Sequence, residues 1–199
     1  MSFISYLING ISLGSVYAII ALGYTMVYGI AKMLNFAHGD VIMVGGFAVF
    51  TIVSTLGLAP VLGILVAVVI CTALGMLIER VAYKPLRNAS SPLAVLITAI
   101  GVSYLLQNVA LLIFGANTKS FTSVVTISPL KLADGQLIIS GETIVTIIAG
   151  IVIMVCLTLF VHKSKAGQAM LAVSEDKGAA QLMGINVNGT IALIFAIGS

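Results

Sequence analysis

The feature that most constrains this chain is a series of five long apolar segments that contain no charged residue. Each resembles a helix that crosses a lipid bilayer, which needs about 20 mostly apolar residues. Backbone groups in lipid must be satisfied internally, so such segments fold as helices. A sixth apolar segment has only the ten residues from Thr190 to Ser199, so we expect a chain that is incomplete at its C-terminus. The five predicted spans are residues 4–30, 41–57, 60–78, 93–115 and 143–161.

The charge content supports a membrane protein and excludes other classes. Charged residues make up 8% of the chain and hydrophobic residues 60%. A soluble domain carries about 25% charged residues because its surface must be solvated. The net charge of +3 and the lack of a Lys/Arg stripe argue against nucleic acid as a partner. We therefore predict an all-α, polytopic membrane helix bundle that forms one domain over residues 1–199, with the lipid bilayer around it.

Basic residues predict the orientation of the bundle, because Lys and Arg are retained on the cytoplasmic side. They follow the first, third and fifth spans, and these three loops share the same parity. We therefore place loops 31–40, 79–91 and 162–190 in the cytoplasm and the N-terminus outside. No basic residue precedes Lys32, so no cleavable signal peptide is expected. The basic residues used are Lys32, Arg80, Lys84, Arg87, Lys163 and Lys165.

The loop 116–142 is predicted to lie outside the membrane and to contain a β-hairpin. Asp134-Gly135 stands between alternating apolar residues, which is a strong signal for a hairpin turn.

The loop 162–190 is predicted to contain a short cytoplasmic helix over residues 175–183. Ser174 is the expected N-cap, with Glu175 and Asp176 in the first turn, and Gly184 is the expected left-handed residue after the helix. A helix this short needs tertiary contacts, so it packs either on its own bundle or on a partner protein. The residues alone leave both alternatives open. Residues 169–173 are predicted to form a further helical turn or two upstream, and the candidate contact residues of the pair are Met170, Leu171, Leu182 and Met183.

Polar residues gather in the stretch NFAHGD, from Asn35 to Asp40. In one interpretation this is a cytoplasmic loop in which Asn35 or Asp40 caps the next helix. In the other, the helix breaks inside the bundle and the freed polar groups line a translocation path or form a hinge. The candidate path or hinge residues are Asn35, His38, Gly39, Asp40, Gln107 and Asn108. We expect Gln107 and Asn108 to face the bundle interior, because amides are costly in lipid.

The polar residues do not predict an enzyme or a metal site. His38 and His162 belong to separate loops, and no acidic cluster joins them. No arrangement of nucleophile and base can be proposed either. No P-loop motif is present, so we expect no ATPase site and no directly bound cofactor.

A family resemblance is carried by four stretches: NGISLGSVYAIIALGYTMVYGIAKMLNFAHGD, YKPLR, ITAIGVSYLLQN and GQAMLAVSEDKGAAQLMGINV. Together they resemble the permease subunits of ABC importers for branched-chain (hydrophobic) amino acids, across essentially the whole chain. The cytoplasmic loop of ABC-importer permeases carries Glu-Ala-Ala, three residues, Gly, nine residues, Ile, one residue and Leu-Pro. This chain matches at Ala179, Ala180, Gly184 and Ile194. It departs from the pattern where Gly178 replaces the Glu and where Ala196 and Ile197 replace Leu-Pro.

The resemblance implies a transport function with several partners. These are a second homologous permease, two cytoplasmic ATP-binding subunits that use the ATP, and a periplasmic or lipid-anchored substrate-binding protein. It implies a bacterial-type inner membrane and alternating access, driven by the partner ATPase through the loop 162–190. The predicted ATPase-coupling residues are Gly167, Glu175, Asp176, Ala179, Ala180 and Gly184. The resemblance also makes NFAHGD a signature region.

Two alternatives to a branched-chain amino acid importer stay open. Related permeases of the same group import urea or short amides. A passive channel or a structural membrane subunit would need no ATP, and its loop 162–190 would pack only on its own bundle.

Overall fold

The computed structural model describes residues 2–87, 92–120, 129–132 and 137–199. In the part of the chain that it describes, the regular elements are helices except for one pair of three-residue strands. The elements are α1 (Ser2–Ala31), α2 (His38–Phe50), η1 (Thr51–Thr55), α3 (Pro60–Ile78), η2 (Glu79–Tyr83), η3 (Lys84–Leu86), α4 (Pro92–Phe114), β1 (Leu130–Leu132), β2 (Leu137–Ile139), α5 (Gly141–Lys163), α6 (Lys165–Glu175), α7 (Lys177–Leu182) and α8 (Val187–Gly198).

The five predicted membrane spans are confirmed. Among the described residues, five helical stretches have the length and composition to cross a membrane, and α8 is a shorter apolar helix. Pro60 is the first residue of α3. An N–H at this position would have no partner within the helix, so the lack of an N–H in proline costs no hydrogen bond. The chain is thus an all-α polytopic membrane protein. The five stretches are Phe3–Ala31, His38–Thr55, Pro60–Leu86, Leu93–Phe114 and Gly141–Lys163.

The third span is longer than predicted. The sequence indicated that it ends at Ile78 and that residues 79–91 form a loop, but the helix continues through η2 and η3 to Leu86. The first charged residue of this extension, Glu79, is buried and forms an ion pair with Arg87. Because this partner compensates the buried charge, the helix does not have to stop where the charges begin.

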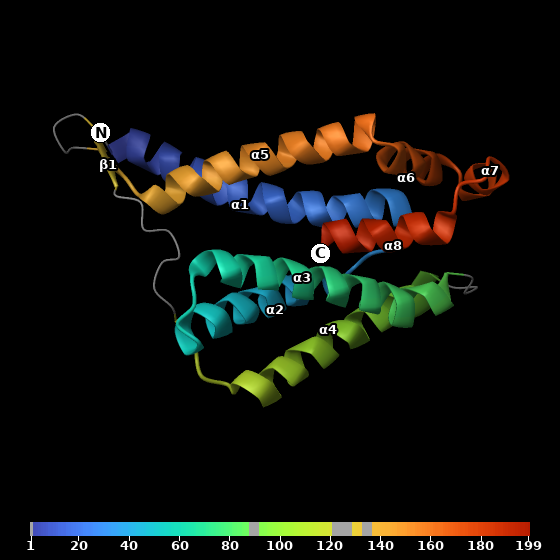
Figure 1. Ribbon diagram of the computed structural model, residues 1–199, viewed down its shortest axis with the longest axis horizontal. Coiled ribbons are helices and arrows are strands. Elements are labelled where there is room, and N and C mark those ends of the chain that lie inside the picture. The colour runs from blue at the N-terminus through green and yellow to red at the C-terminus, as the bar shows by residue number, and fades with distance from the viewer. Residues whose placement is uncertain (1, 88–91, 121–128, 133–136) are drawn as a thin grey trace. The chain divides into compact units, whose positions relative to one another are not determined.

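Contacts divide the chain into two compact units, each with its own packing. Unit 1 comprises Met1–Leu22 and Thr122–Gly167. In this unit α5 lies along the first part of α1 (Figure 1), and a Cβ on Gly150 would lie 3.4 Å from the Ser15 Cβ. Strands β1 and β2 pair antiparallel, with Leu130 opposite Ile139, in the segment where the sequence predicts a hairpin. The predicted turn at Asp134-Gly135 lies outside the described residues.

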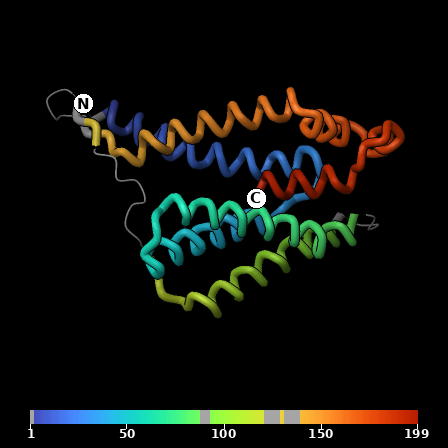
Figure 2. Tube along the Cα trace, viewed as in Figure 1, coloured from blue at the N-terminus to red at the C-terminus, as the bar shows by residue number. Residues whose placement is uncertain are grey.

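Unit 2 comprises Gly23–Phe121 and Gln168–Ser199. In this unit α3 packs against α2 and α8, while α4 contacts α2 and η2. The trace in Figure 2 turns back through α6 and α7 into α8. The fully buried side chains of this unit include Val27, Val41, Tyr83, Ile194 and Phe195. Unit 2 therefore holds both polar regions that the sequence singles out, NFAHGD and the segment around α7.

Candidate functional site

The stretch NFAHGD forms a break between two helices. Helix α1 ends at Ala31, and Lys32 adopts the left-handed conformation (φ 57°) while its N–H donates to the Tyr28 carbonyl at 3.0 Å. Helix α2 begins at His38, and its N-cap is Ala37, whose side chain has no acceptor atom. The prediction that Asn35 or Asp40 caps this helix was therefore wrong. Both side chains have partners on other helices.

Asn35 is held by a tyrosine from the end of the third span. Its side chain is 4% exposed, and the Tyr83 hydroxyl lies 3.1 Å from Asn35 Oδ1 and 3.3 Å from the Leu34 carbonyl oxygen. The Tyr83 ring also packs against the Phe195 ring of α8, with centroids 5.1 Å apart. Sequence reasoning missed Tyr83. The signal was its spacing, since Glu79, Tyr83 and Arg87 recur every four residues and share one helix face.

His38 lies at the start of α2, 6% exposed, beside the second half of α1. Its ring meets the Tyr24 ring edge-on, with centroids 6.1 Å apart. A Cβ on Gly23 would lie 3.0 Å from His38 Cε1 and 2.8 Å from the Gly198 carbonyl oxygen. The glycine therefore permits the close approach of α1, α2 and α8. The next residue, Gly39, is exposed with open space around it.

Asp40 connects α2 to α4. Its side chain is buried, and Gln107 Nε2 donates to Asp40 Oδ1 at 3.0 Å and to Ser103 Oγ at 3.2 Å. The carboxylate also sits in the first turn of α2, where the helix dipole favours negative charge. Asn108 differs in its partner, since its Nδ2 donates to the Tyr104 carbonyl of its own helix at 2.7 Å. Both amides were expected to face the bundle interior, but both residues are exposed. Of the two, Gln107 is the one with a hydrogen bond to another described helix.

Removing the Gln107 amide should destabilise unit 2. In Gln107→Leu the buried Asp40 carboxylate loses a donor, so we expect a loss of about 1–2 kcal/mol in the free energy of unfolding. Asn108→Leu is the matched control and should change that free energy by less than about 0.5 kcal/mol. Unfolding of the detergent-solubilised chain in a denaturing detergent measures both. Equal effects of the two substitutions would contradict a specific role for the Asp40–Gln107 bond.

The second polar region is the segment from α6 to α8. Helix α6 continues through Ser174 to Glu175, so the prediction that Ser174 caps the short helix was wrong. The N-cap of α7 is Asp176, whose Oδ1 accepts hydrogen bonds from the N–H groups of Gly178 at 2.7 Å and Ala179 at 3.0 Å. The Ser174 hydroxyl instead donates to the Leu171 carbonyl of α6. Asp176 thus satisfies two N–H groups of α7 that have no partner within the helix.

Helix α7 ends at Leu182, and Gly184 is the left-handed residue after it, as the sequence predicts. This residue has φ +82°, a conformation that glycine adopts without strain. The Gly184 N–H donates to the Gln181 carbonyl, and the Ile185 N–H donates to the Ala180 carbonyl, both at 3.0 Å. This pair of bonds is the Schellman motif. Helix α8 then starts with Asn186 as its N-cap, accepting from the Gly189 N–H at 2.9 Å.

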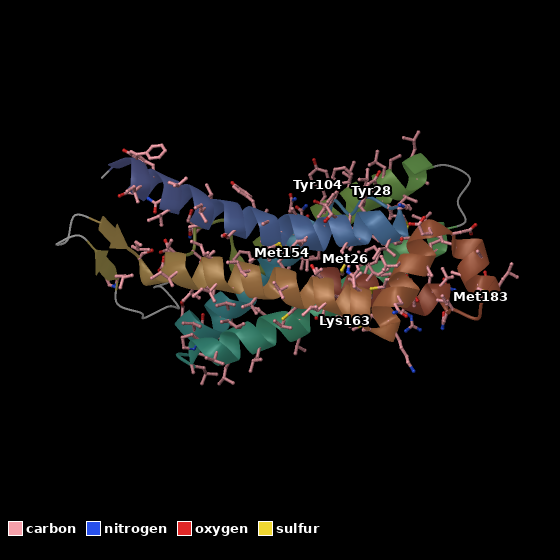
Figure 3. The ribbon with its side chains drawn as sticks, turned by 90° about the horizontal axis from the view of Figure 1, so that it is seen from above. Met26, Tyr28, Tyr104, Met154, Lys163 and Met183 are labelled. Carbon is pink, nitrogen blue, oxygen red and sulfur yellow. The ribbon has the colours of Figure 1, made fainter. Side chains whose placement is uncertain are left out.

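The side chains of this segment divide into a buried set and an exposed set. Met170 of α6 and Ala180 of α7 are buried, and Lys177 Nζ donates to the Ala31 carbonyl at the end of α1, 2.9 Å away. In contrast, Leu182 is 90% exposed and Met183 83% exposed. Figure 3 shows Met183 at the outer end of α7. The expectation that Met170 is a free contact residue was therefore wrong, whereas Leu182 and Met183 are bare.

The remaining residues predicted for ATPase coupling lie along the same segment. Gly167 is buried in α6, and its N–H donates to Ser164 Oγ at 2.9 Å. Glu175, the last residue of α6, and Ala179 of α7 are exposed. Among the described residues, no group of three or more His, Cys, Asp or Glu side chains is placed to hold a metal ion.

Comparisons with known proteins give a consistent result. The family described as "Branched-chain amino acid transport system / permease component" matches residues 6–199. The high-affinity branched-chain amino acid transport system permease protein BraD of Pseudomonas aeruginosa is 40% identical over 210 residues, covering 99% of this chain and 67% of its own length. LivH of Escherichia coli, a permease protein of the same description, is 41% identical over 215 residues, with the same two coverages.

An archaeal relative is more distant. The probable branched-chain amino acid transport permease protein LivH of Methanocaldococcus jannaschii is 31% identical over 179 residues, covering 86% of this chain and 55% of its own length. No solved structure matches this chain.

Proposed function

This chain belongs to the family of branched-chain amino acid transport system permease components, and we propose that it is the membrane-spanning subunit of an ATP-driven importer for branched-chain or related hydrophobic amino acids. The permease is a transport subunit and not an enzyme. ATP is bound and hydrolysed by two cytoplasmic partner subunits. A second, homologous permease completes the membrane pathway, and a periplasmic or lipid-anchored binding protein delivers the substrate.

The observation that carries this proposal is the two-sided character of α7. One side of the helix is anchored to unit 2 by Ala180 and by the bond from Lys177 to the end of α1. The other side presents Leu182 and Met183 to the outside with most of their surface bare. Adjacent bare apolar side chains on a fixed helix suit insertion into a hydrophobic groove of a partner. We assign that partner as the ATPase.

The ends of α7 make it suitable for transmitting a displacement. A six-residue helix has no stability of its own. Asp176 holds its first turn, and the bonds around Gly184 hold its last turn and connect it directly to α8. A push on Leu182 and Met183 would therefore move the segment as a body. The Lys177 bond would pass that movement to the end of α1, next to NFAHGD.

We assign NFAHGD to a hinge between α1 and α2. Asn35, His38 and Asp40 are each less than 9% exposed, and their contacts lie within unit 2. Side chains engaged in this way are suited to setting the angle between helices. Gly39 and Asn108, which are exposed, stay as candidates for the surface along which the substrate moves.

The proposed placement is the inner membrane of a bacterial-type cell, with the N-terminus outside. Loops 31–40 and 162–190 face the cytoplasm, as does the part of loop 79–91 that follows Leu86, in agreement with the basic residues in and next to these segments. The loop 116–142 faces outward.

One crosslinking experiment tests both the orientation and the ATPase assignment. Single cysteines replace Met183 and Lys119, both exposed, in a chain whose native cysteines, Cys71 and Cys156, are changed to alanine. With the ATPase encoded nearby co-expressed in membranes, M183C should crosslink to it in an ATP-dependent manner, and K119C should not. An impermeant maleimide added to cells should label K119C only. Labelling of M183C from outside would refute the orientation, and an inserted M183C chain that never reaches the ATPase would refute the coupling assignment.

A further inference from the structure

A polar cavity lies in unit 2, where the end of the third span meets the start of α7 and of α8. Its volume is about 520 Å³, within the ~300–1,000 Å³ range of ligand sites. Lys84 and Arg87 line it from the end of the third span, and Lys177 lines it from α7. Three side-chain amides complete the polar part of the wall, those of Gln181, Asn186 and Asn188.

The charge of the cavity is positive. Among the described residues that line it, three are cationic and none is acidic. Glu79 forms an ion pair with Arg87 and neutralises that one cation. The Lys84 side chain is exposed and has no hydrogen bond or ion pair to a described residue. Burial lowers the pKa of Lys177, and the positive charges of Arg87 and Lys32 lower it further. Lys177 is therefore repelled by Arg87 and Lys32 when no anion is present.

One donor of the cavity wall also lacks an acceptor. Arg87 uses its two terminal nitrogens, one toward Glu79 and the other toward the Asn188 side chain. Its Nε–H is buried and has no acceptor among the described residues. A buried N–H without a partner is destabilising. An anion in the cavity would supply the negative charge that these cations lack.

We propose that this cavity binds a phosphate group, held by Lys84, Arg87 and Lys177 with help from the surrounding amides. Phosphate offers several acceptor oxygens and suits a mixed set of guanidinium, ammonium and amide donors. The location favours a lipid, because Leu86 ends the third membrane span and places Lys84 and Arg87 at the level of the headgroups. A bound phosphate would connect the third span to α7 and α8. The site does not depend on the proposed transport function.

The test uses the purified chain in a neutral detergent, with the melting temperature and native mass spectrometry as the two readouts. The probes are phosphatidylglycerol against phosphatidylcholine, and inorganic phosphate against chloride at constant ionic strength. The informative variant is Lys84→Gln, because the side chain of this lysine makes no hydrogen bond or ion pair to a described residue. Its matched control is Arg80→Gln, an exposed cation one turn earlier that does not line the cavity. Without a probe, both variants should melt at the wild-type temperature.

Phosphatidylglycerol should raise the melting temperature saturably, and Lys84→Gln should weaken its apparent affinity about fivefold, while Arg80→Gln leaves it unchanged. That result supports a lipid headgroup. The same pattern with inorganic phosphate, and no further effect of the lipid tails, supports a soluble phosphate compound. Equal weakening by both variants would show diffuse attraction and overturn the proposal. The absence of binding by either probe would also overturn it.

Discussion

ATP-driven uptake should fall about a hundredfold or more when Leu182 and Met183 are both replaced by aspartate. The two side chains are large apolar groups at the C-terminal end of α7 with most of their surface exposed, and in the proposed complex they fill a groove of the ATPase. Each apolar anchor in such a groove contributes ~2 kcal/mol or more, and each substitution also places a carboxylate in an apolar cavity. The measurement is uptake of radiolabelled leucine, isoleucine or valine by cells that express the complete transporter.

The control for this prediction is Leu171→Asp. Leu171 is a 40% exposed leucine of α6, outside α7, so uptake should stay within about twofold of wild type. The amount of each variant in the membrane is measured in parallel. It should equal the wild-type amount for the double variant, because neither Leu182 nor Met183 packs in the core. If the double variant is inserted and transports normally, α7 is not the coupling helix. An equal loss in Leu171→Asp would mean that any acidic residue in the segment is harmful.

Tyr83→Ala should destabilise the chain strongly, by about 3–5 kcal/mol. The side chain is fully buried, its hydroxyl contacts Asn35 and the Leu34 carbonyl, and its ring packs on Phe195. Removing it creates a cavity and leaves the Asn35 side chain without its partner. Tyr83→Phe keeps the ring and loses only the hydroxyl, so its cost should be about 1–2 kcal/mol. The melting temperature of the detergent-solubilised chain reports both changes.

Tyr104→Ala provides the matched control. This tyrosine of α4, labelled in Figure 3, is 62% exposed, and its loss should change stability by less than about 0.5 kcal/mol. A clear difference between Tyr83→Ala and Tyr83→Phe would assign most of the stabilisation to ring packing. Equal effects of the two would show that the hydroxyl bond to NFAHGD is the dominant contribution. A Tyr83→Ala chain that melts like wild type would contradict the packing of this ring in the core of unit 2.

The parts of the fold that sequence predicted well depend on local chemistry. A run of apolar residues must be helical in lipid whatever its neighbours are, so most span ends were placed within a few residues. Gly184 was found for a similar reason, because a helix that stops often places glycine in the left-handed conformation. The start of α7 was misplaced because Ser174 and Asp176 both have side chains that cap helices. The choice between them depended on α6 continuing to Glu175.

Residues that act across the fold could not be paired from sequence. Asp40 and Gln107 are 67 positions apart, and Tyr83 and Asn35 are 48 apart. Periodicity shows which face a side chain lies on, but not which helix that face meets. Asn108 illustrates the limit, since it stands next to Gln107 and yet bonds only to its own helix. For the same reason, the sequence did not distinguish the residues of the α6–α7 segment that are buried, such as Met170, from those that are exposed, such as Leu182 and Met183.

The sequence by itself determined that this chain is a helical membrane protein, where its five long apolar helices lie and, through its motifs, which family it belongs to. The spans follow from the apolar character of each segment, which must be helical in lipid. The family follows from the order of residues in the motifs. Only the tertiary structure decided that NFAHGD is packed against Tyr83 and Gln107, that α7 is anchored on one side and bare on the other, and that three cations surround one cavity. Those arrangements depend on distances between residues far apart in the chain, and such distances are set by helix packing.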